Sequence, residues 1–175
     1  MTMPSYTLTQ LNSLSRAEFV RVVGPVFEHS PWIAEAAFAK QPFADLAQLH
    51  DALMNVVAYA GEEKQVQLIQ AHPDLVGRAA LAGTLTPESN REQASAGLDR
   101  LSAEEIAAFQ KCNQAYREKF GFPFVICARL NKKEAILMGF ETRLKNTREQ
   151  EIKAALDEIG KIARLRLQDL VDAQR

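Results

Sequence analysis

Two side chains in this sequence are suited to proton transfer, the imidazole of His72 and the carboxylate of Glu92. His72 lies in the octapeptide AHPDLVGR, directly after residues 62–70, whose apolar side chains recur at helical spacing. Pro73 disfavours the α conformation for His72 and has no amide donor, so the helix should end here. An imidazole titrates near neutral pH and burial can retune a carboxylate, which makes the two a general acid/base combination. Alternatively, His72 only hydrogen-bonds the backbone at the helix end.

Glu92 belongs to a predicted helix that begins at TPE, residues 86–88. Threonine is a natural N-cap, proline suits the first helical position, and glutamate favours the positive end of the helix dipole. Ser89, Glu92 and Gln93 follow at spacings i, i+3 and i+4, which places them on one helix face. This face is either a solvated stripe or the polar wall of a pocket near a helix N-terminus, where an anion is favoured. The spacing leaves both interpretations open.

Hydrophobic periodicity and capping signals predict an all-α fold, a bundle of about seven to nine helices. The capping boxes Ser15/Glu18 and Ser102/Glu105 mark two of the helix starts. Trp32 is expected to anchor the core and His50 to be solvated. Residues 74–85 should form a structured loop with one helical turn. The predicted helices cover residues 16–28, 31–37, 46–60, 62–70, 86–96, 103–120, 134–144 and 149–171.

One run, FPFVICA at residues 122–128, has the composition of a strand. An isolated strand has nothing to pair with, so we expect a buried irregular connector at this place. No linker or internal repeat interrupts the sequence, and we expect residues 1–175 to form a single domain.

The composition is that of an ordinary globular protein, with 47% hydrophobic and 25% charged residues and a formal net charge of −1. The absence of a basic excess argues against a nucleic-acid or membrane-surface partner. No secretory signal or membrane-length apolar run is present, so we expect a cytoplasmic protein. Cys112 and Cys127 lack metal-ligand spacing and are expected to be reduced core thiols. No metal or cofactor fingerprint is found.

Three segments in order resemble the 2-oxo-4-hydroxy-4-carboxy-5-ureidoimidazoline (OHCU) decarboxylase family. They are AHPDLVGR, GTLTPESNREQASAGL at residues 83–98, and the segment from Phe109 through FGFPFVICAR to Arg129. The resemblance implies an all-helical homodimer that acts without a cofactor. It also implies the reaction, decarboxylation of the small anionic substrate OHCU to (S)-allantoin, the last step from urate to allantoin in purine catabolism.

Residue by residue, the resemblance places the catalytic positions at His72, as general acid, and Glu92, as its facing partner. Arg166 is matched to an arginine that meets the substrate carboxylate. The expected substrate-binding residues are Pro73, Ser89, Asn90, Arg91, Glu92, Gln93, Phe124, Val125, Ile126, Cys127, Ala128 and Arg166.

A second hypothesis comes from a different functional class, a non-catalytic helical binding or assembly module. It predicts a polar stripe of Ser89, Glu92 and Gln93 with no pocket behind it. A ligand that binds only the native state raises the thermal midpoint, so titration with allantoin or a purine-like anion distinguishes the two hypotheses.

Overall fold

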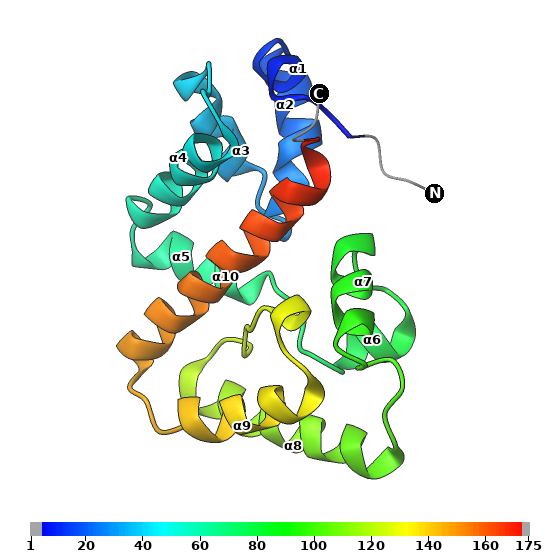
Figure 1. Cartoon of the computed structure of the whole chain (residues 1–175). Coiled ribbons are helices and arrows are strands. Elements are labelled where there is room, and N and C mark those ends of the chain that lie inside the picture. Colours follow the sequence, from blue (N-terminus) through cyan, green and yellow to red (C-terminus); the bar gives the residue numbers. More distant parts are fainter. Residues whose placement is uncertain (1–4, 173–175) are drawn as a thin grey trace. The chain divides into compact units, whose positions relative to one another are not determined.

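The computed structural model describes residues 5–172, and the regular elements of this part of the chain are helices (Figure 1). The extended backbone there includes one isolated bridge, a parallel pairing of Tyr6 with Val171. The predicted all-α class is therefore confirmed. The described chain divides into two compact units, residues 5–71 with 160–172, and residues 72–159. The expectation of a single domain stays a prediction.

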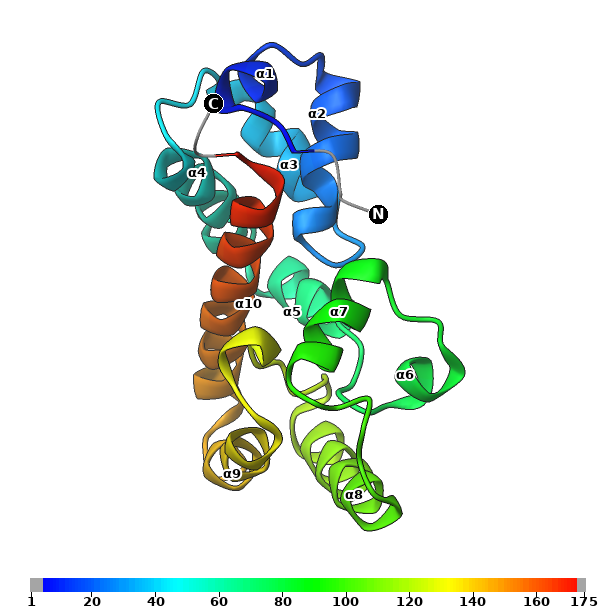
Figure 2. The same cartoon turned by 45° about the vertical axis from the view of Figure 1, so that its right-hand side comes forward.

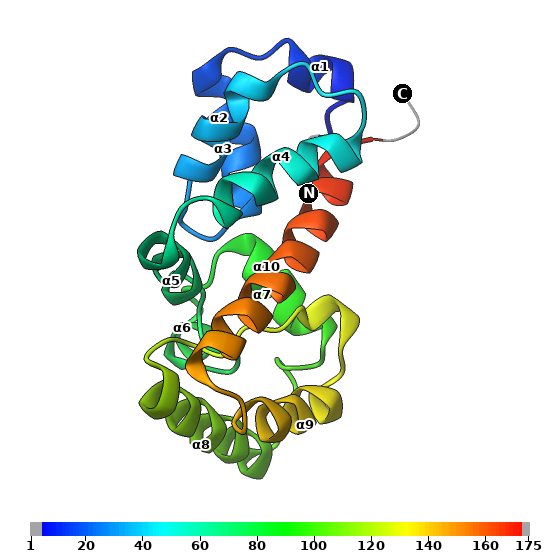
Figure 3. The same cartoon turned by 90° about the vertical axis from the view of Figure 1, so that its left-hand side faces the viewer.

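The first unit is built from α-helices and short 3₁₀ turns (Figure 3). Its elements are α1 (Leu8–Asn12), α2 (Arg16–Val23), η1 (Gly24–Val26), α3 (Trp32–Ala37), η2 (Phe38–Lys40), α4 (Leu46–Ala58), α5 (Glu62–Gln70) and the part of α10 (Arg148–Leu170) from Gly160 onward. The predicted capping box of Ser15 and Glu18 begins α2. The helix predicted over residues 16–28 is shorter, because Pro25 cannot donate to the α-helical ladder and the chain tightens into η1.

Packing in the first unit centres on Phe19 of α2, which is fully buried. Its ring meets Phe38 edge-on at 5.6 Å between centroids and stacks with Phe43 at 6.2 Å. The expectation of a core anchor at Trp32 is wrong: this ring is partly exposed, and the Lys64 ammonium lies 5.2 Å from its centroid. A cation over the face of an indole ring is attracted by the ring's electron density.

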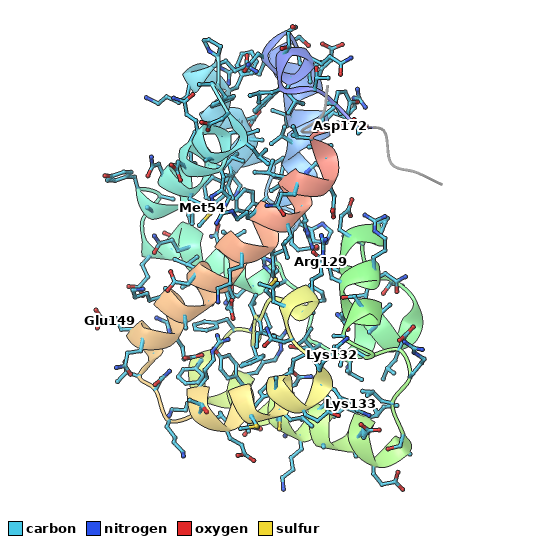
Figure 4. All side chains as sticks on the ribbon, viewed as in Figure 1. Met54, Arg129, Lys132, Lys133, Glu149 and Asp172 are labelled. Atoms are coloured by element: carbon cyan, nitrogen blue, oxygen red, sulfur yellow. The ribbon has the colours of Figure 1, made fainter. Side chains whose placement is uncertain are left out.

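A second correction concerns His50 of α4, which we expected to be solvated. Its Nε2 atom lies 2.8 Å from the carbonyl oxygen of Gly160 in α10, so the ring is partly buried and hydrogen-bonded. Beside this contact, Met54 of α4, labelled in Figure 4, faces Gly160. A Cβ atom built on Gly160 would lie 3.2 Å from the Met54 methyl carbon. The glycine thus admits a close approach of α4 to α10.

We predict that Gly160→Ala stabilises the protein. Glycine in a helix interior costs about 0.8–1 kcal/mol relative to alanine. Among residues 5–172 the near neighbour of an added Cβ is the flexible end of Met54, which can move by a few tenths of an ångström. The midpoint of thermal unfolding, followed by circular dichroism, should rise by about 2–4 °C for a chain of this size. The matched control is Gly121→Ala, because Gly121 ends α8 with φ of +80°, where alanine is strained and the midpoint should fall.

The second unit carries all predicted site residues except Arg166. Its elements are α6 (Arg78–Ala82), α7 (Pro87–Ser95), α8 (Ala103–Phe120), η3 (Ala128–Leu130), α9 (Lys133–Arg143) and α10 up to Ile159 (Figure 2). Residues 122–127 connect α8 to η3 without regular structure. The predicted irregular connector and the single helical turn before α7 are both confirmed.

The core of the second unit is a cluster of aromatic rings from α8, the connector and α9. Phe124 of the connector stacks on Phe140 of α9 with centroids 3.9 Å apart, and its edge meets Tyr116 of α8 at 5.3 Å. Phe120 and Phe122 close the same cluster. The connector is therefore held by ring contacts instead of a β-ladder, which explains how an extended segment without a partner strand stays ordered.

Candidate active site

His72 lies directly beyond the end of α5, as the sequence predicted. The helix ends at Gln70, Ala71 is its C-cap, and the following His72 is buried, with 7% of its surface exposed. Helical geometry stops there because Pro73 follows. The imidazole thus belongs to a loop, residues 72–77, that connects to α6.

Two residues of the loop, Val76 and Gly77, have backbone geometry that a residue with a side chain does not readily adopt. Val76 adopts φ of +55°, although it is β-branched and buried. A β-branched residue in the left-handed region is strained, at a cost of order 1–3 kcal/mol that the surrounding structure must offset. Next to it, a Cβ atom on Gly77 would lie only 2.6 Å from the Asp74 Cβ atom, so this position accepts no side chain.

Helix α8 holds the loop from one side. The Nε atom of Arg117 lies 2.9 and 3.0 Å from the two carboxylate oxygens of Asp74. One helical turn earlier, the buried Asn113 donates from its Nδ2 atom to the Leu75 carbonyl at 2.7 Å. Two consecutive loop residues are therefore fixed to the same helix.

Helix α7 also holds the loop, and Gln93 is one of the side chains that do so. Its Oε1 atom accepts from the Val76 amide at 3.1 Å, and its Nε2 atom donates to the Asp74 carbonyl at 3.5 Å. Gln93 is 5% exposed and directly follows Glu92. The strained residue of the His72 loop is thus tied to the helix that carries the second predicted catalytic residue.

The polar stripe of α7 is a buried face and not a solvated one. Ser89 and Gln93 are 6% and 5% exposed, and Glu92 lies at the edge of this face, partly exposed. Asn90 and Arg91 point to the exposed side of the same helix. Of the two interpretations left open by the spacing, burial of Ser89 and Gln93 contradicts the solvated stripe, and the polar wall of a pocket stays a prediction.

The connector lies close to α7. The 3₁₀ turn η3, which directly follows the connector in the chain, packs against α7 (Figure 1). Phe124, Val125, Cys127 and Ala128 are buried, whereas Ile126 is partly exposed. Burial raises the pKa of the Cys127 thiol, and a backbone hydrogen bond from Leu130 lowers it. The negative charges of Glu158 and Glu92 raise this pKa further. Glu92 is therefore near enough to the connector for its charge to act there. Both cysteines are free thiols, but only Cys127 is in the core as expected, since Cys112 is partly exposed.

Arg166 is held within the first unit. Its Nη2 atom lies 2.8 Å from Glu28 Oε1, and its Nη1 atom donates to the Pro25 carbonyl at 3.1 Å. The two side chains are 6% and 1% exposed, so the guanidinium is a buried, oriented group. The expected contact of Arg166 with a substrate carboxylate stays a prediction.

Comparison with known proteins identifies the family. A family model described as OHCU decarboxylase matches residues 12–168. The chain belongs to this family. It is 43% identical over 164 residues to the 2-oxo-4-hydroxy-4-carboxy-5-ureidoimidazoline decarboxylase of Amia calva, covering 94% of each chain. The enzyme of the same name from Halalkalicoccus jeotgali is 41% identical, over 96% of this chain and 93% of the relative. The one from Mus musculus is 39% identical, over 95% of this chain and 93% of the relative.

Solved structures agree with this family assignment. A crystal structure of (S)-allantoin synthase superposes with a TM-score of 0.77 at 29% identity, over 95% of this chain and 55% of the other. A crystal structure of OHCU decarboxylase in the presence of (S)-allantoin has a TM-score of 0.64 at 23% identity, over 79% of this chain and 89% of the other. The second likeness supports the fold.

In this member of the OHCU decarboxylase family, sequence patterns do not reveal the residues that hold the loop and the connector. The hydrogen bonds of Gln93 to Val76 and Asp74 give its amide a structural role, and the expected contact of Gln93 with substrate stays a prediction. Arg117 lies at an exposed position of α8, so periodicity offered no signal for it. For Asn113 a signal was present, because it falls on the same helix face as Phe109, Tyr116 and Phe120, and a buried asparagine requires a polar partner.

A pocket of about 730 Å³ opens between α6 and α8 of this OHCU decarboxylase family member. Its walls include Asp74, Arg78, Asn113 and Arg117. None of the predicted substrate-binding or catalytic residues lines it, so this pocket is not the predicted substrate site.

Proposed function

We propose that His72 and Glu92 carry out the reaction of the OHCU decarboxylase family in this chain, the conversion of OHCU to (S)-allantoin. As a member of that family, the chain is a carboxy-lyase of urate degradation. The observation that carries the proposed roles is the link between the two residues: Gln93, next to Glu92, hydrogen-bonds the loop that begins at His72.

The chemistry requires little beyond positioning and a proton. When the bond to the carboxylate carbon breaks and carbon dioxide leaves, its electron pair stays on the ring carbon that bears the hydroxyl. The adjacent carbon–nitrogen double bond of the ring can accept that pair, so the substrate provides its own electron sink. The ring nitrogen that receives the pair is protonated. The resulting enol becomes the ring carbonyl of allantoin as the hydroxyl gives up its proton and the ureido-bearing carbon receives one, so that one proton is taken up overall. An enzyme accelerates such a step by orienting the substrate and by placing charge and a proton donor.

In this proposal the His72 imidazolium contacts the substrate hydroxyl and delivers the proton. Its place in a loop that Arg117, Asn113 and Gln93 hold keeps the ring in one position through the reaction. Delivery from one face of the ring gives one enantiomer. Glu92 accepts hydrogen bonds from the ureido and ring nitrogens on the facing side.

The remaining contacts hold the heterocycle and its carboxylate. Ser89 and the backbone of residues 124–128 would bind the ring, because an irregular segment presents amide and carbonyl groups that a β-ladder would consume. Pro73, Asn90, Arg91 and Gln93 complete the proposed binding set, and Arg166 would pair with the substrate carboxylate.

The test of this function uses OHCU made in place from urate by urate oxidase and hydroxyisourate hydrolase. Its decay is followed by ultraviolet absorbance, and the product by circular dichroism, with and without this protein. Accelerated decay with a growing signal of (S)-allantoin is the expected result. Decay at the spontaneous rate with racemic product would contradict the proposal and favour a binding module.

The proposal also includes a homodimer, which the family resemblance implies, and the cytoplasmic location that the sequence patterns predict. In the described residues, 5–172, no helix is long and apolar enough to cross a membrane. Light scattering of the eluted protein should give twice the chain mass of 19.5 kDa. A mass of one chain at micromolar concentration would contradict the dimer.

A further inference from the structure

The second unit contains a carboxylate that the proposed reaction does not use, that of Glu151 in the first turns of α10. Its side chain is 0% exposed. Three donors reach it: the Tyr116 hydroxyl at 2.5 Å and the Arg143 Nε atom at 2.7 Å, both to Oε1, and the Asn146 Nδ2 atom at 2.8 Å to Oε2. A buried carboxylate is tolerated only when it is paired and hydrogen-bonded in this way.

The surroundings keep the neighbouring phenol protonated, so the Glu151 carboxylate always has this donor. Burial raises the pKa of the Tyr116 hydroxyl far above its ordinary value, and the hydrogen bond to Glu151 raises it further, while the Arg143 charge opposes both. The carboxylate therefore has fixed partners, and it fixes in turn the guanidinium of Arg143.

Arg143 extends this network to the connector. Its Nη1 atom donates to the Val125 carbonyl at 2.6 Å, and its guanidinium carbon lies 4.3 Å from the centroid of the Phe124 ring. A planar guanidinium can make both contacts at once, stacking on a ring and donating along defined directions from its edge. One side chain thus contacts two consecutive residues of the connector.

The hydrogen bond from Arg143 to the Val125 carbonyl determines the direction of the next backbone N–H, that of Ile126. The peptide bond between Val125 and Ile126 is trans, since the one cis bond in the described residues precedes Pro42. In a planar trans peptide the carbonyl and the N–H point in opposite directions, so the Ile126 N–H is directed away from Arg143. Within residues 5–172 this N–H donates to no backbone or side-chain acceptor, and Ile126 is the residue of the connector that is partly exposed.

We propose that Arg143, held by buried Glu151, is a positioning residue that aims the Ile126 N–H at the substrate. The inference rests on the proposed function, because it assumes that the connector backbone binds OHCU. Arg143 does not touch the substrate. It fixes the peptide plane whose far side forms one of the hydrogen bonds to the heterocycle.

The test compares Arg143→Lys with a control on the same helix, Ile136→Val. Lysine keeps the charge but cannot bond Glu151, bond Val125 and stack on Phe124 together. Ile136 is fully buried in α9 and has no polar group, so its truncation destabilises the protein without removing a hydrogen bond to the connector. A double variant, Arg143→Gln with Glu151→Gln, removes both charges and covers the case in which the lysine variant does not fold.

The measurements are kcat, KM, the thermal midpoint and the amide chemical shift of Ile126 in a ¹⁵N-labelled sample. For Arg143→Lys we expect KM to rise roughly tenfold, the equivalent of about one hydrogen bond, with kcat changed much less and the Ile126 signal displaced. Ile136→Val should lower the thermal midpoint and leave KM and that signal unchanged.

Three results would overturn the inference in distinguishable ways. An unchanged KM in an active Arg143→Lys enzyme would remove the positioning role and leave the proposed function intact. A KM that rises equally in the Ile136→Val control would show a general effect of stability. Wild-type protein that does not decarboxylate OHCU would contradict the proposed function, and with it any role of Arg143 in that reaction.

Discussion

Replacing His72 with glutamine should lower the turnover of OHCU by roughly 10²- to 10⁴-fold, the usual contribution of a positioned general acid. Glutamine retains a polar amide of similar reach, so a hydrogen bond to the substrate hydroxyl can persist. What it lacks is a proton that can be donated near neutral pH. The loss should therefore fall mainly on kcat, with the substrate still bound.

The matched control is His50→Gln in α4. It makes the same chemical change at a histidine outside the proposed site, and the glutamine amide can still donate to the Gly160 carbonyl. We expect wild-type turnover and a similar thermal midpoint for this variant. Because His72 is 93% buried, with 7% exposed, far-ultraviolet circular dichroism and thermal unfolding must accompany the kinetics. A folded His72→Gln enzyme with near-normal kcat would remove the imidazole from the mechanism.

The fold could be predicted well from the sequence wherever local rules decide the structure. The capping boxes at Ser15 and Ser102 begin α2 and α8 because these hydroxyls and the glutamates three residues later satisfy free amides at a helix start. Gly121 ends α8 in the left-handed conformation that favours glycine. Helix α1 was missed because five residues are too few to establish a hydrophobic period.

The predicted site depended on two kinds of information, helix spacing and the family resemblance, and each predicted a different part of it. Helix spacing placed Ser89, Glu92 and Gln93 on one face, and the structure shows that this face is buried. Spacing could not show what covers it, because the burial of a polar helix face depends on segments distant in sequence. The resemblance to the OHCU decarboxylase family supplied the candidate roles that spacing could not.

The supporting interactions could not be predicted, since each joins residues far apart in the chain. Arg117 and Asp74 are 43 positions apart, and Tyr116 and Glu151 are 35 apart. Their partners depend on how α8, α9 and α10 pack, which is a property of the assembled core. Before that packing is known, Arg143 and Glu151 look like ordinary charges of exposed helix faces. Their burial is what indicates a specific role.

Replacing Glu92 with glutamine should reduce kcat/KM by roughly 10- to 100-fold, because hydrogen bonds to a charged group contribute about 1.5–3 kcal/mol and 1.4 kcal/mol is a tenfold change. The substitution preserves shape and removes the charge. Glu88→Gln, the same change in the first turn of α7, is its control. It should alter only helix stability, by a few tenths of a kcal/mol.

The double variant, His72→Gln with Glu92→Gln, then tests whether the two residues act together. If Glu92 holds the substrate for proton delivery by His72, most of its effect is already lost when His72 is absent, so the double variant should be little slower than His72→Gln alone. Strictly multiplied losses would mean that the two side chains contribute independently. The handedness of the product gives a second readout. A slow Glu92→Gln enzyme that still yields (S)-allantoin retains delivery of the proton from one face of the ring. Racemic product from that variant would show that Glu92 determines which face receives the proton.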